Sequence, residues 1–430
     1  MATVLATYYG GGGLIRNVQY VHKLGLYWIL FLFVNSFSIW LFSRLMGRMG
    51  PFMQSLSIAE MMGNVYGKCP RIITALFGIA RSIVSITIQI IAMVQAISIC
   101  VDLDLVNARV VTIFAALILI FYDTFGGVRA VTITDIFQFL TFTIVIPFLA
   151  WLMLKKTGRS VIEVVAFLQT QEKFQLSSLL HFDTKLLSRV AMILCIMVPD
   201  MGTPEIMQRV YMSSGPTQAK KVFLYVCLLS VVISSFIRLI GLFVFVGGGE
   251  ALPIEDIWCY IITNVSPTFK GVVCVSLLAM AMSTADSCLN ACSVMVSHDI
   301  LGTIQKEMAD VYKLKIARST TLVVGLSSMF LAFYCDDLLA LLMLGFSFSI
   351  PVITAPALLA IFGFRGSSRT ALIGMATGVL AILAWNKWVE PVTGINGSFI
   401  CLYVSQWIGY DGRTLSIQTT ERGRLGSLCI

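Results

Sequence analysis

The chain has 430 residues, of which 58% are hydrophobic and 12% charged, and its formal net charge is +8. Soluble domains are roughly half apolar and about one quarter charged, so this composition predicts a polytopic, all-α membrane protein. The apolar stretches are unbroken, whereas the strands of a membrane barrel alternate. No basic stretch interleaved with aromatic residues indicates a nucleic-acid surface, and we expect no nucleic-acid partner.

Residues that a metalloenzyme would need are sparse. The eleven cysteines are scattered, with no CxxC spacing, and many lie inside apolar stretches, as Cys227, Cys274 and Cys292 do. Cysteines in such positions usually act as small buried hydrophobic residues. The three histidines are far apart, so clustered metal ligands are not expected. The composition therefore predicts neither an enzyme nor a cofactor.

The first apolar segment, residues 2–22, is unusual because Gly10–Gly13 lies in its middle, followed by Arg16 and Asn17. Glycine frees the backbone from helical geometry, so this pattern predicts a helix that is broken within the membrane. The alternative is a GxxxG contact between two close helices.

Four further spans are predicted before residue 155, at 26–46, 72–100, 108–125 and 133–154. In the span 72–100, Ser82, Ser85 and Gln89 share one helix face. We expect Arg81 to extend to the near membrane interface rather than to contact a solute. A short turn joins the spans 108–125 and 133–154, and the polar connection 155–186 is predicted to contain a short amphipathic helix.

The sixth segment, 187–207, repeats the peculiarity of the first. Two prolines and a glycine, Pro199, Gly202 and Pro204, should break a helix here, with Asp200 between them. Further spans are predicted at 221–246, 272–300, 318–334, 338–361, 370–386 and 396–409, which gives about 12 transmembrane helices.

The span 272–300 carries the most informative polar residues. At helical spacing one face presents a carboxylate among hydroxyl and amide groups, with Thr284 beside it: Ser283, Asp286, Ser287 and Asn290. A carboxylate is costly in hydrocarbon, so this face should meet protein or a water-filled cavity. Hydroxyl and carbonyl oxygens suit a small, hard cation. The alternative is that these groups only join neighbouring helices.

Two broken helices, each leading five spans, indicate an inverted-repeat transporter. The predicted divisions are a first repeat at 1–155, an extracytoplasmic connection at 156–186, a second repeat at 187–362, and two further helices with a cytoplasmic tail at 363–430. Lysine and arginine concentrate in loops on one side, which places that side in the cytoplasm of a cell-membrane protein.

Three motifs in order resemble the sodium:solute symporter family: GGVRAVTITDIFQ at 126–138, GTPEIMQRVYMSS at 202–214 and MSTADS at 282–287. The similarity extends over residues 1–360. It implies the five-plus-five inverted-repeat (LeuT-like) fold, with sodium held by the carbonyls of Ala6, Tyr9 and Met280 and the hydroxyls of Ser283 and Thr284.

The same resemblance places Asp135 near a second sodium site or exit route. Asp286 is assigned there from its own position, because it lies one turn past Ser283 and can compensate a bound cation. A solute is expected between the two helix breaks and the neighbouring spans. The residues assigned to the solute are Gly10, Gly11, Ser85, Gln89, Asp200, Gly202 and Ser347.

The function these patterns favour is secondary active transport, in which inward sodium flow drives uptake of a small organic solute by alternating access. A proton-coupled carrier of the same fold is an alternative, with Asp135 or Asp286 as its relay. A non-transporting solute sensor is another. The expected partners are sodium, the solute and the lipid bilayer.

Overall fold

The computed structural model describes residues 1–101, 104–179, 200–249, 251–305, 309–335 and 349–393, a few residues between 190 and 197, and residues 341 and 345. Within these ranges the chain is helical and contains no β-strand. Eight of the helices found there are long and apolar enough to cross a membrane: Leu26–Met46, Lys68–Val101, Arg109–Gly127, Val131–Lys156, Pro216–Gly248, Pro267–Ile304, Asp310–Ala332 and Ser368–Thr393. The prediction of an all-α, multi-pass membrane protein is therefore confirmed.

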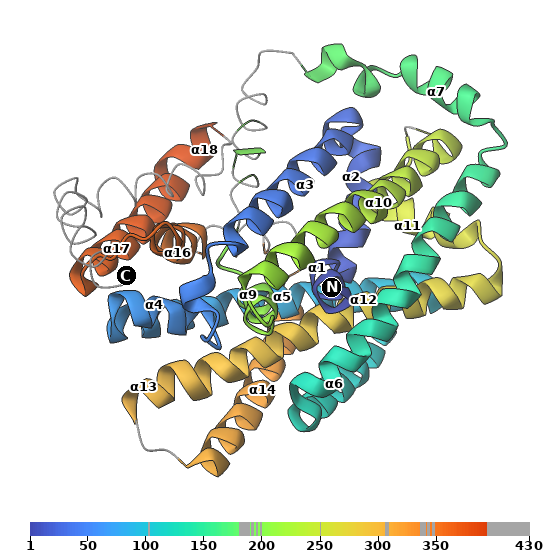
Figure 1. Cartoon of the computed structure of the whole chain (residues 1–430). Coiled ribbons are helices and arrows are strands. Elements are labelled where there is room, and N and C mark those ends of the chain that lie inside the picture. Colours follow the sequence, from blue (N-terminus) through green and yellow to red (C-terminus); the bar gives the residue numbers. More distant parts are fainter. Residues whose placement is uncertain are drawn as a thin grey trace.

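The first five predicted segments appear in order (Figure 1). Their helices are α1 (Ala2–Tyr8), α2 (Gly11–Leu24), α3 (Leu26–Met46), α5 (Lys68–Val101) and α6 (Leu105–Lys156). A short helix that was not predicted, α4 (Ile58–Tyr66), lies between α3 and α5 in the chain. The helix α6 holds two spans, and the turn predicted between them is a kink at Gly127, where φ is 60° and ψ is −168°. Only glycine adopts this backbone conformation readily, so the GG pair determines where α6 bends.

The second half begins with α7 (Val161–Gln169), which confirms the short helix predicted in the connection. It continues with α9 (Pro204–Tyr211), α10 (Pro216–Gly248), η4 (Ile254–Asp256), α11 (Ile257–Thr263), α12 (Pro267–Val294), the π-helical η5 (Met295–Leu301), α13 (Gly302–Ile304) and α14 (Asp310–Ala332). The chain then forms η6 (Ile350–Thr354), α16 (Ala355–Ile361), α17 (Ser368–Ala384), η7 (Trp385–Val389) and α18 (Glu390–Thr393). The span predicted at 396–409 lies outside the described residues.

Two groups of helices pack together (Figure 1). In one group α5 and α12 run along each other, with α6 and α14 against them, and in the other α3 and α10 pair beside α2. Small side chains on α12, among them Ala281, Ala285 and Cys292, are fully buried. Lipid tails are as apolar as a helix surface, so close packing of small residues is what holds such helices together.

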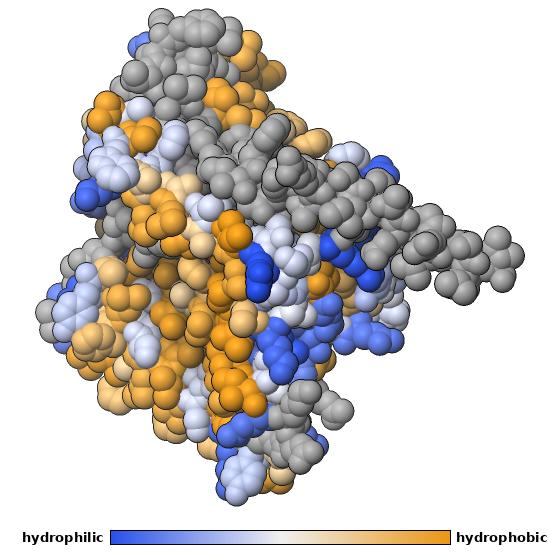
Figure 2. All heavy atoms as spheres, turned by 90° about the vertical axis from the view of Figure 1, so that its left-hand side faces the viewer, coloured by the Kyte–Doolittle hydropathy of each residue, from blue (hydrophilic) through white to orange (hydrophobic). Residues whose placement is uncertain are grey.

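Large apolar side chains cover much of the surface. On α6, Phe114 and Ile118 are each 64% exposed and Phe137 is 67% exposed. The face drawn in Figure 2 is likewise apolar over a large area. Soluble monomers rarely expose such contiguous patches, but a bilayer covers them with acyl chains. The polar residues that remain inside the molecule are therefore the ones to examine for function.

Candidate functional site

The first helix break lies at Tyr9 and Gly10, between α1 and α2. Tyr9 has φ −97° and ψ 81°, and Gly10 has φ −78° and ψ 155°. The predicted break is thus confirmed at Gly10, whereas Gly11–Gly13 already belong to α2 and do not extend it. Gly11 serves close packing instead, because a Cβ there would lie 3.0 Å from the carbonyl oxygen of Leu277. The last carbonyls of α1 lack helical partners and are available to other groups.

One of these carbonyls contacts the polar face of α12. The hydroxyl of Thr284 donates to the carbonyl oxygen of Thr7 at 3.2 Å and also lies 3.4 Å from the carbonyl oxygen of Met280. Ala6 and Met280 are fully buried, and Tyr9 is 8% exposed. The end of α1 and the middle of α12 therefore lie side by side, joined by oxygen atoms in a region from which water is largely excluded.

Ser283 points to a different helix. Its hydroxyl donates to Oδ1 of Asp135, in the second span of α6, at 2.6 Å. The other carboxylate oxygen, Oδ2, accepts from Nη2 of Arg209 at 3.0 Å, and the same nitrogen lies 2.7 Å from Oγ of Ser287. The guanidinium of Arg209 therefore already provides a positive charge beside Asp135, where a second cation was predicted.

We call Thr7, Asp135, Arg209, Ser283 and Ser287 the Asp135 network. Oγ1 of Thr7 and Oγ of Ser287 are 2.9 Å apart, which links α1 to the network. All five side chains are buried, with Asp135, Ser283 and Ser287 at 0% exposure. Burying two charges is costly unless they are paired and hydrogen-bonded. Here the charges are paired and both oxygens of Asp135 accept hydrogen bonds, whereas Nε of Arg209 has no partner among the described residues. It joins α1, α6, α9 and α12 at one point.

The second helix break occupies residues 200–203, directly before Pro204 begins α9. Oδ1 of Asp200 accepts the backbone N–H of Gly202 at 2.9 Å and the hydroxyl of Thr354 at 3.2 Å. A Cβ on Gly202 would lie 2.8 Å from Cβ of Ser349. Asp200 and Gly202 therefore hold the break against η6. Pro199, which was also predicted to break this helix, lies outside the described residues.

Arg81 pairs with this break, so the prediction that it extends to the membrane interface is wrong. Its Nη2 lies 2.6 Å from Oδ2 of Asp200, and its Nη1 donates to Oγ of Ser349 and, at 3.4 Å, to the carbonyl of Gly345. The arginine side chain is only 12% exposed. The carboxylate of Asp200 is 18% exposed, and a pair that is largely shielded from solvent is screened less than one in water.

Of the remaining solute candidates, Gln89 lies at the first break. Oε1 of Gln89 lies 3.4 Å from the backbone nitrogen of Gly12, and a Cβ on Gly10 would approach Nε2 of Gln89 to 2.7 Å. Ser85, one turn before Gln89 on α5, is half-buried and hydrogen-bonded with the thiol of Cys288. Ser347 lies outside the described residues. The structure thus brings Gln89 to the first break but engages Ser85 with α12.

Asp286 is buried without a hydrogen-bond donor. Its side chain is 0% exposed, and neither carboxylate oxygen has a hydrogen-bond partner in the described part of the chain. Nδ2 of Asn290, one turn further along α12, is also unpartnered. Such groups are costly in a low-dielectric interior and call for a ligand or a bound proton. No hydrogen bond or ion pair between described residues joins Asp286 to the Asp135 network.

Sequence reasoning assigned no role to Arg238, a buried arginine in α10. Its Nε donates to the carbonyl of Trp28 at 3.2 Å and its Nη1 to that of Ser234 at 3.1 Å. Ser234 also contacts the hydroxyl of Tyr9, 2.7 Å away. The available signal was an arginine in the middle of an otherwise apolar span, which is a functional hypothesis in its own right.

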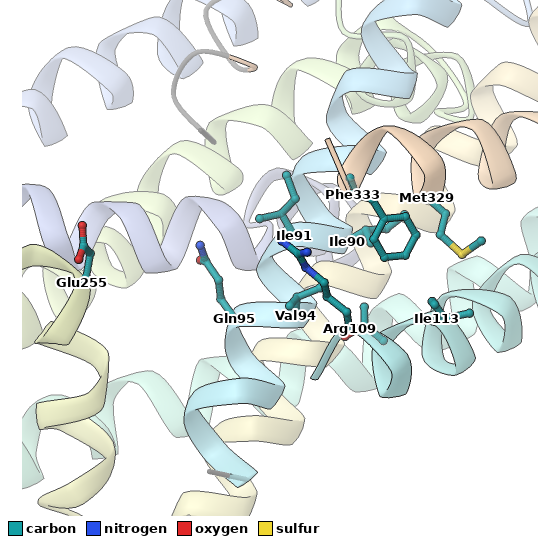
Figure 3. Close-up of a pocket in the computed structure, with 11 residues that line it drawn as sticks. Ile90, Ile91, Val94, Gln95, Arg109, Ile113, Glu255, Met329 and Phe333 are labelled. Atoms are coloured by element: carbon teal, nitrogen blue, oxygen red, sulfur yellow. The ribbon is translucent and has the colours of Figure 1, made fainter. Parts of the chain in front are cut away.

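A cavity of about 410 Å³ is lined by residues of α5, α6, η4 and the end of α14 (Figure 3). Its wall is mostly apolar, with Ile90 and Ile91 from α5 and Met329 and Phe333 at the end of α14, and its polar lining includes Arg109. Neither the Asp135 network nor the Arg81–Asp200 pair is part of that lining. The candidate site is therefore the polar region at the two breaks and α12.

The family follows from sequence comparison. A profile of the sodium:solute symporter family matches residues 1–378. The chain belongs to this family. Sodium/proline symporter 2 of Staphylococcus saprophyticus is 25% identical over 301 residues, 67% of this chain and 57% of that protein. The sodium/sialic acid symporter NanT of Aliivibrio fischeri is 20% identical over 336 residues, 73% of this chain and 64% of that protein. The matches therefore span less than two thirds of either relative.

Solved structures agree on the fold of this family member. A substrate-bound, outward-open Na+-coupled sialic acid symporter superposes with a TM-score of 0.80 at 18% identity, covering 96% of this chain and 88% of that one. Mhp1, a nucleobase-cation-symport-1 family transporter, gives 0.60 at 15% identity, covering 94% and 90%. These likenesses confirm the LeuT-like fold class expected from the sequence.

Proposed function

We propose that this chain is a secondary active transporter that couples inward sodium flow to the uptake of a small organic solute. The observation that carries the proposal is the meeting of a helix break with the polar face of α12, through the contact of Thr284 with Thr7. Broken helices present free backbone groups inside the membrane, where an ion and a solute can bind. Membership of the sodium:solute symporter family supports the same function.

For sodium we propose the carbonyls of Ala6, Tyr9 and Met280 and the hydroxyls of Ser283 and Thr284. Support comes from Thr284, whose hydroxyl lies between carbonyls of α1 and α12. Ser283 would have to turn from Asp135 to bind the same ion. The ligands are all neutral oxygens, which suit a monovalent hard cation.

Asp135 and Asp286 are proposed for a second sodium site or an exit route. At Asp135 the guanidinium of Arg209 would have to withdraw before a sodium ion could take its place. At Asp286 both oxygens are free of donors and could accept a cation directly. The two carboxylates thus differ in what a cation must displace.

For the solute we propose the space between the breaks, bounded by Gly10, Gly11, Ser85, Gln89, Asp200, Gly202 and Ser347. The polar groups described there include an amide at the first break and the Arg81–Asp200 pair at the second. Proline and sialic acid, named for two relatives, both carry a carboxylate and are the first solutes to test.

The decisive experiment is uptake of labelled L-proline and N-acetylneuraminic acid into proteoliposomes holding the purified chain. An inward sodium gradient should drive accumulation, an equal potassium gradient should not, and an inside-negative potential should increase it. A potential of 100 mV supplies about 2.3 kcal/mol per charge. Accumulation driven by a proton gradient without sodium would instead identify a proton-coupled carrier. Binding of either solute without accumulation would identify a sensor.

A further inference from the structure

Two cysteines from distant parts of the chain meet where α5 and α12 pack together. The Sγ of Cys274, on the second turn of α12, lies 3.9 Å from the carbonyl oxygen of Ala96. Cys100 is one turn beyond Ala96 on α5, and its thiol is hydrogen-bonded to that of Cys274. Both cysteines are free thiols, 7% and 8% exposed. Two thiols on facing helices thus lie beside each other.

The position of this pair favours oxidation of its thiols. The last residue of α5, Val101, directly follows Cys100 and is 56% exposed, so the pair lies close to the surface. Lys270 is one turn before Cys274 on the same face of α12, and its ammonium interacts electrostatically with the thiol. Thiolates are the reactive form of cysteine, and a neighbouring cation is a common feature of reactive sites.

The other buried cysteines in the described part of the chain have different neighbours. Cys288 and Cys292 lie one turn apart on the same helix, where Cβ atoms are about 5–6 Å apart, whereas a disulfide needs about 3.5–4.5 Å. The thiols of Cys288 and Cys292 meet the hydroxyls of Ser85 and Ser82. Cys227 lies 3.2 Å from the carbonyl of Ser36.

We propose that Cys100 and Cys274 are a redox-sensitive pair that closes to a disulfide between α5 and α12 when a peroxide reaches this end of the bundle. One thiolate attacks the O–O bond of hydrogen peroxide and becomes a sulfenic acid, while the leaving hydroxide takes a proton and becomes water. The second thiol then attacks the sulfenic sulfur and releases a second water. Two electrons pass from the thiols to the peroxide, and one S–S bond replaces two S–H bonds.

The bond would join two helices that carry parts of the proposed site. Gln89 on α5 faces the first break, and Thr284 on α12 contacts α1. A disulfide at the neighbouring ends of α5 and α12 fixes their spacing and removes conformations of the unfolded chain. We therefore expect oxidation to raise the thermal midpoint of the protein.

The test uses the full chain in nanodiscs, treated with hydrogen peroxide and then with catalase to remove the peroxide. The protein is next unfolded in denaturant that contains N-ethylmaleimide, which blocks the free thiols, and is digested for mass spectrometry. The expected product is one pair of peptides, containing Cys100 and Cys274, joined by a disulfide. Its mass should be two hydrogens less than the sum of the two reduced peptides, and a phosphine reductant should separate them. Cys100→Ser and Cys274→Ser should each abolish it. Cys288→Ser, a buried cysteine on the same helix, should retain it, together with the rise in thermal midpoint.

The parent protein alone can overturn the proposal, so the outcome does not depend on the folding of a variant. If both cysteines carry N-ethylmaleimide after peroxide treatment as completely as before it, the pair does not close. A cross-link that joins Cys274 to a different cysteine, or that persists in Cys100→Ser, would also overturn it. A sulfenic or sulfinic acid on Cys274 with Cys100 still free would show that the two sulfurs do not reach each other.

Discussion

The guanidinium of Arg209 lies 3.0 Å from Oδ2 of Asp135, and both side chains are buried. This ion pair ties the short helix after the second break to the span that follows the Gly127 kink. It also places a protein cation at a carboxylate proposed for sodium. Movement of Arg209 away from Asp135 is therefore a step that sodium binding at this position would require.

Removing one member of this pair should be strongly destabilising. Asp135→Asn leaves the Arg209 charge buried without its partner, which typically costs about 3–5 kcal/mol of unfolding free energy. The double variant Asp135→Asn with Arg209→Gln should lose less than the sum of the single changes. Urea unfolding in detergent measures the unfolding free energy of each variant. Asp310→Asn is the control, because Asp310 pairs with Lys313 at the surface and is 98% exposed. Equal losses in Asp135→Asn and Asp310→Asn would contradict the expectation.

The two adjacent hydroxyls on α12 should control sodium affinity. Replacing both, Ser283→Ala with Thr284→Ala, should raise the sodium concentration for half-maximal uptake by about tenfold or more, equivalent to ~1.4 kcal/mol. Ser293→Ala is a matched control, because this buried hydroxyl on α12 donates to the carbonyl of Asn290 in its own helix. Unchanged sodium dependence in the double variant would remove these hydroxyls from the proposed site.

Arg81 and Asp200 should behave as a coupled pair. In a double-mutant cycle with Arg81→Gln and Asp200→Asn, unfolding free energies should deviate from additivity by about 0.5–3 kcal/mol, since the groups are in direct contact. The control cycle pairs Arg81→Gln with Glu255→Gln, an exposed carboxylate on η4. That cycle should be additive within about 0.3–0.5 kcal/mol. Additivity in both cycles would mean that the 2.6 Å contact does not contribute.

Asp286 should link sodium binding to pH. Its oxygens have no hydrogen-bond donors, so a sodium ion and a proton would compete for the same carboxylate. Asp286→Asn keeps the size of the side chain but removes its charge. We expect this variant to fold, to bind sodium weakly, and to lose the weakening of sodium binding that acid causes in the parent. Sodium titrations followed by thermal shift between about pH 5 and 8 test this.

An outcome in which Asp286→Asn binds sodium as the parent does at every pH would assign the carboxylate a structural role. The side chain would then serve packing of α12 as a buried polar group. That result would leave the proposal for Ser283 and Thr284 intact, because no described hydrogen bond connects the two places.

Glu60 on α4 should make the stability of the protein fall at low pH. His298 lies 3.2 Å away, and its hydrogen bond is the main reason that the pKa of Glu60 is lowered from 4.5, with the N–H of Leu56 and the charge of Arg71 adding to it. A lowered folded-state pKa stabilises the protein above the unfolded value, and this stabilisation is lost as the pH falls through the folded-state pKa. The thermal midpoint of the parent should therefore fall below about pH 4.5.

The matched variants for this effect are Glu60→Gln and His298→Gln. The first should have a lower midpoint at neutral pH and a smaller fall in acid than the parent. The second should show its fall at higher pH, because the largest cause of the lowered pKa is gone. Parallel pH profiles for the parent and Glu60→Gln would exclude Glu60 as the group responsible.

Much of the fold could be predicted from local sequence. The spans follow from length and apolarity, since each must satisfy its own backbone across the membrane. Both breaks follow from residues that disfavour a helix, the Gly10–Gly13 run in one case and residues 199–204 in the other, although only Gly10 of the four glycines lies in the break. The grouping of Ser283, Thr284 and Asp286 also follows, because helical spacing alone places them near one another.

Partners between helices depend on tertiary packing. Arg81 could have extended to the interface, but the fold brings Asp200 within 2.6 Å of it. Asp135 was recognised as a carboxylate near a cation, yet only the packing of both α6 and α9 against α12 decides that this cation is Arg209. Cys100 and Cys274 look like isolated small residues in sequence and meet because α5 and α12 lie together. Charge and thiol pairing act over a few ångströms, so they appear only once the helices have their places.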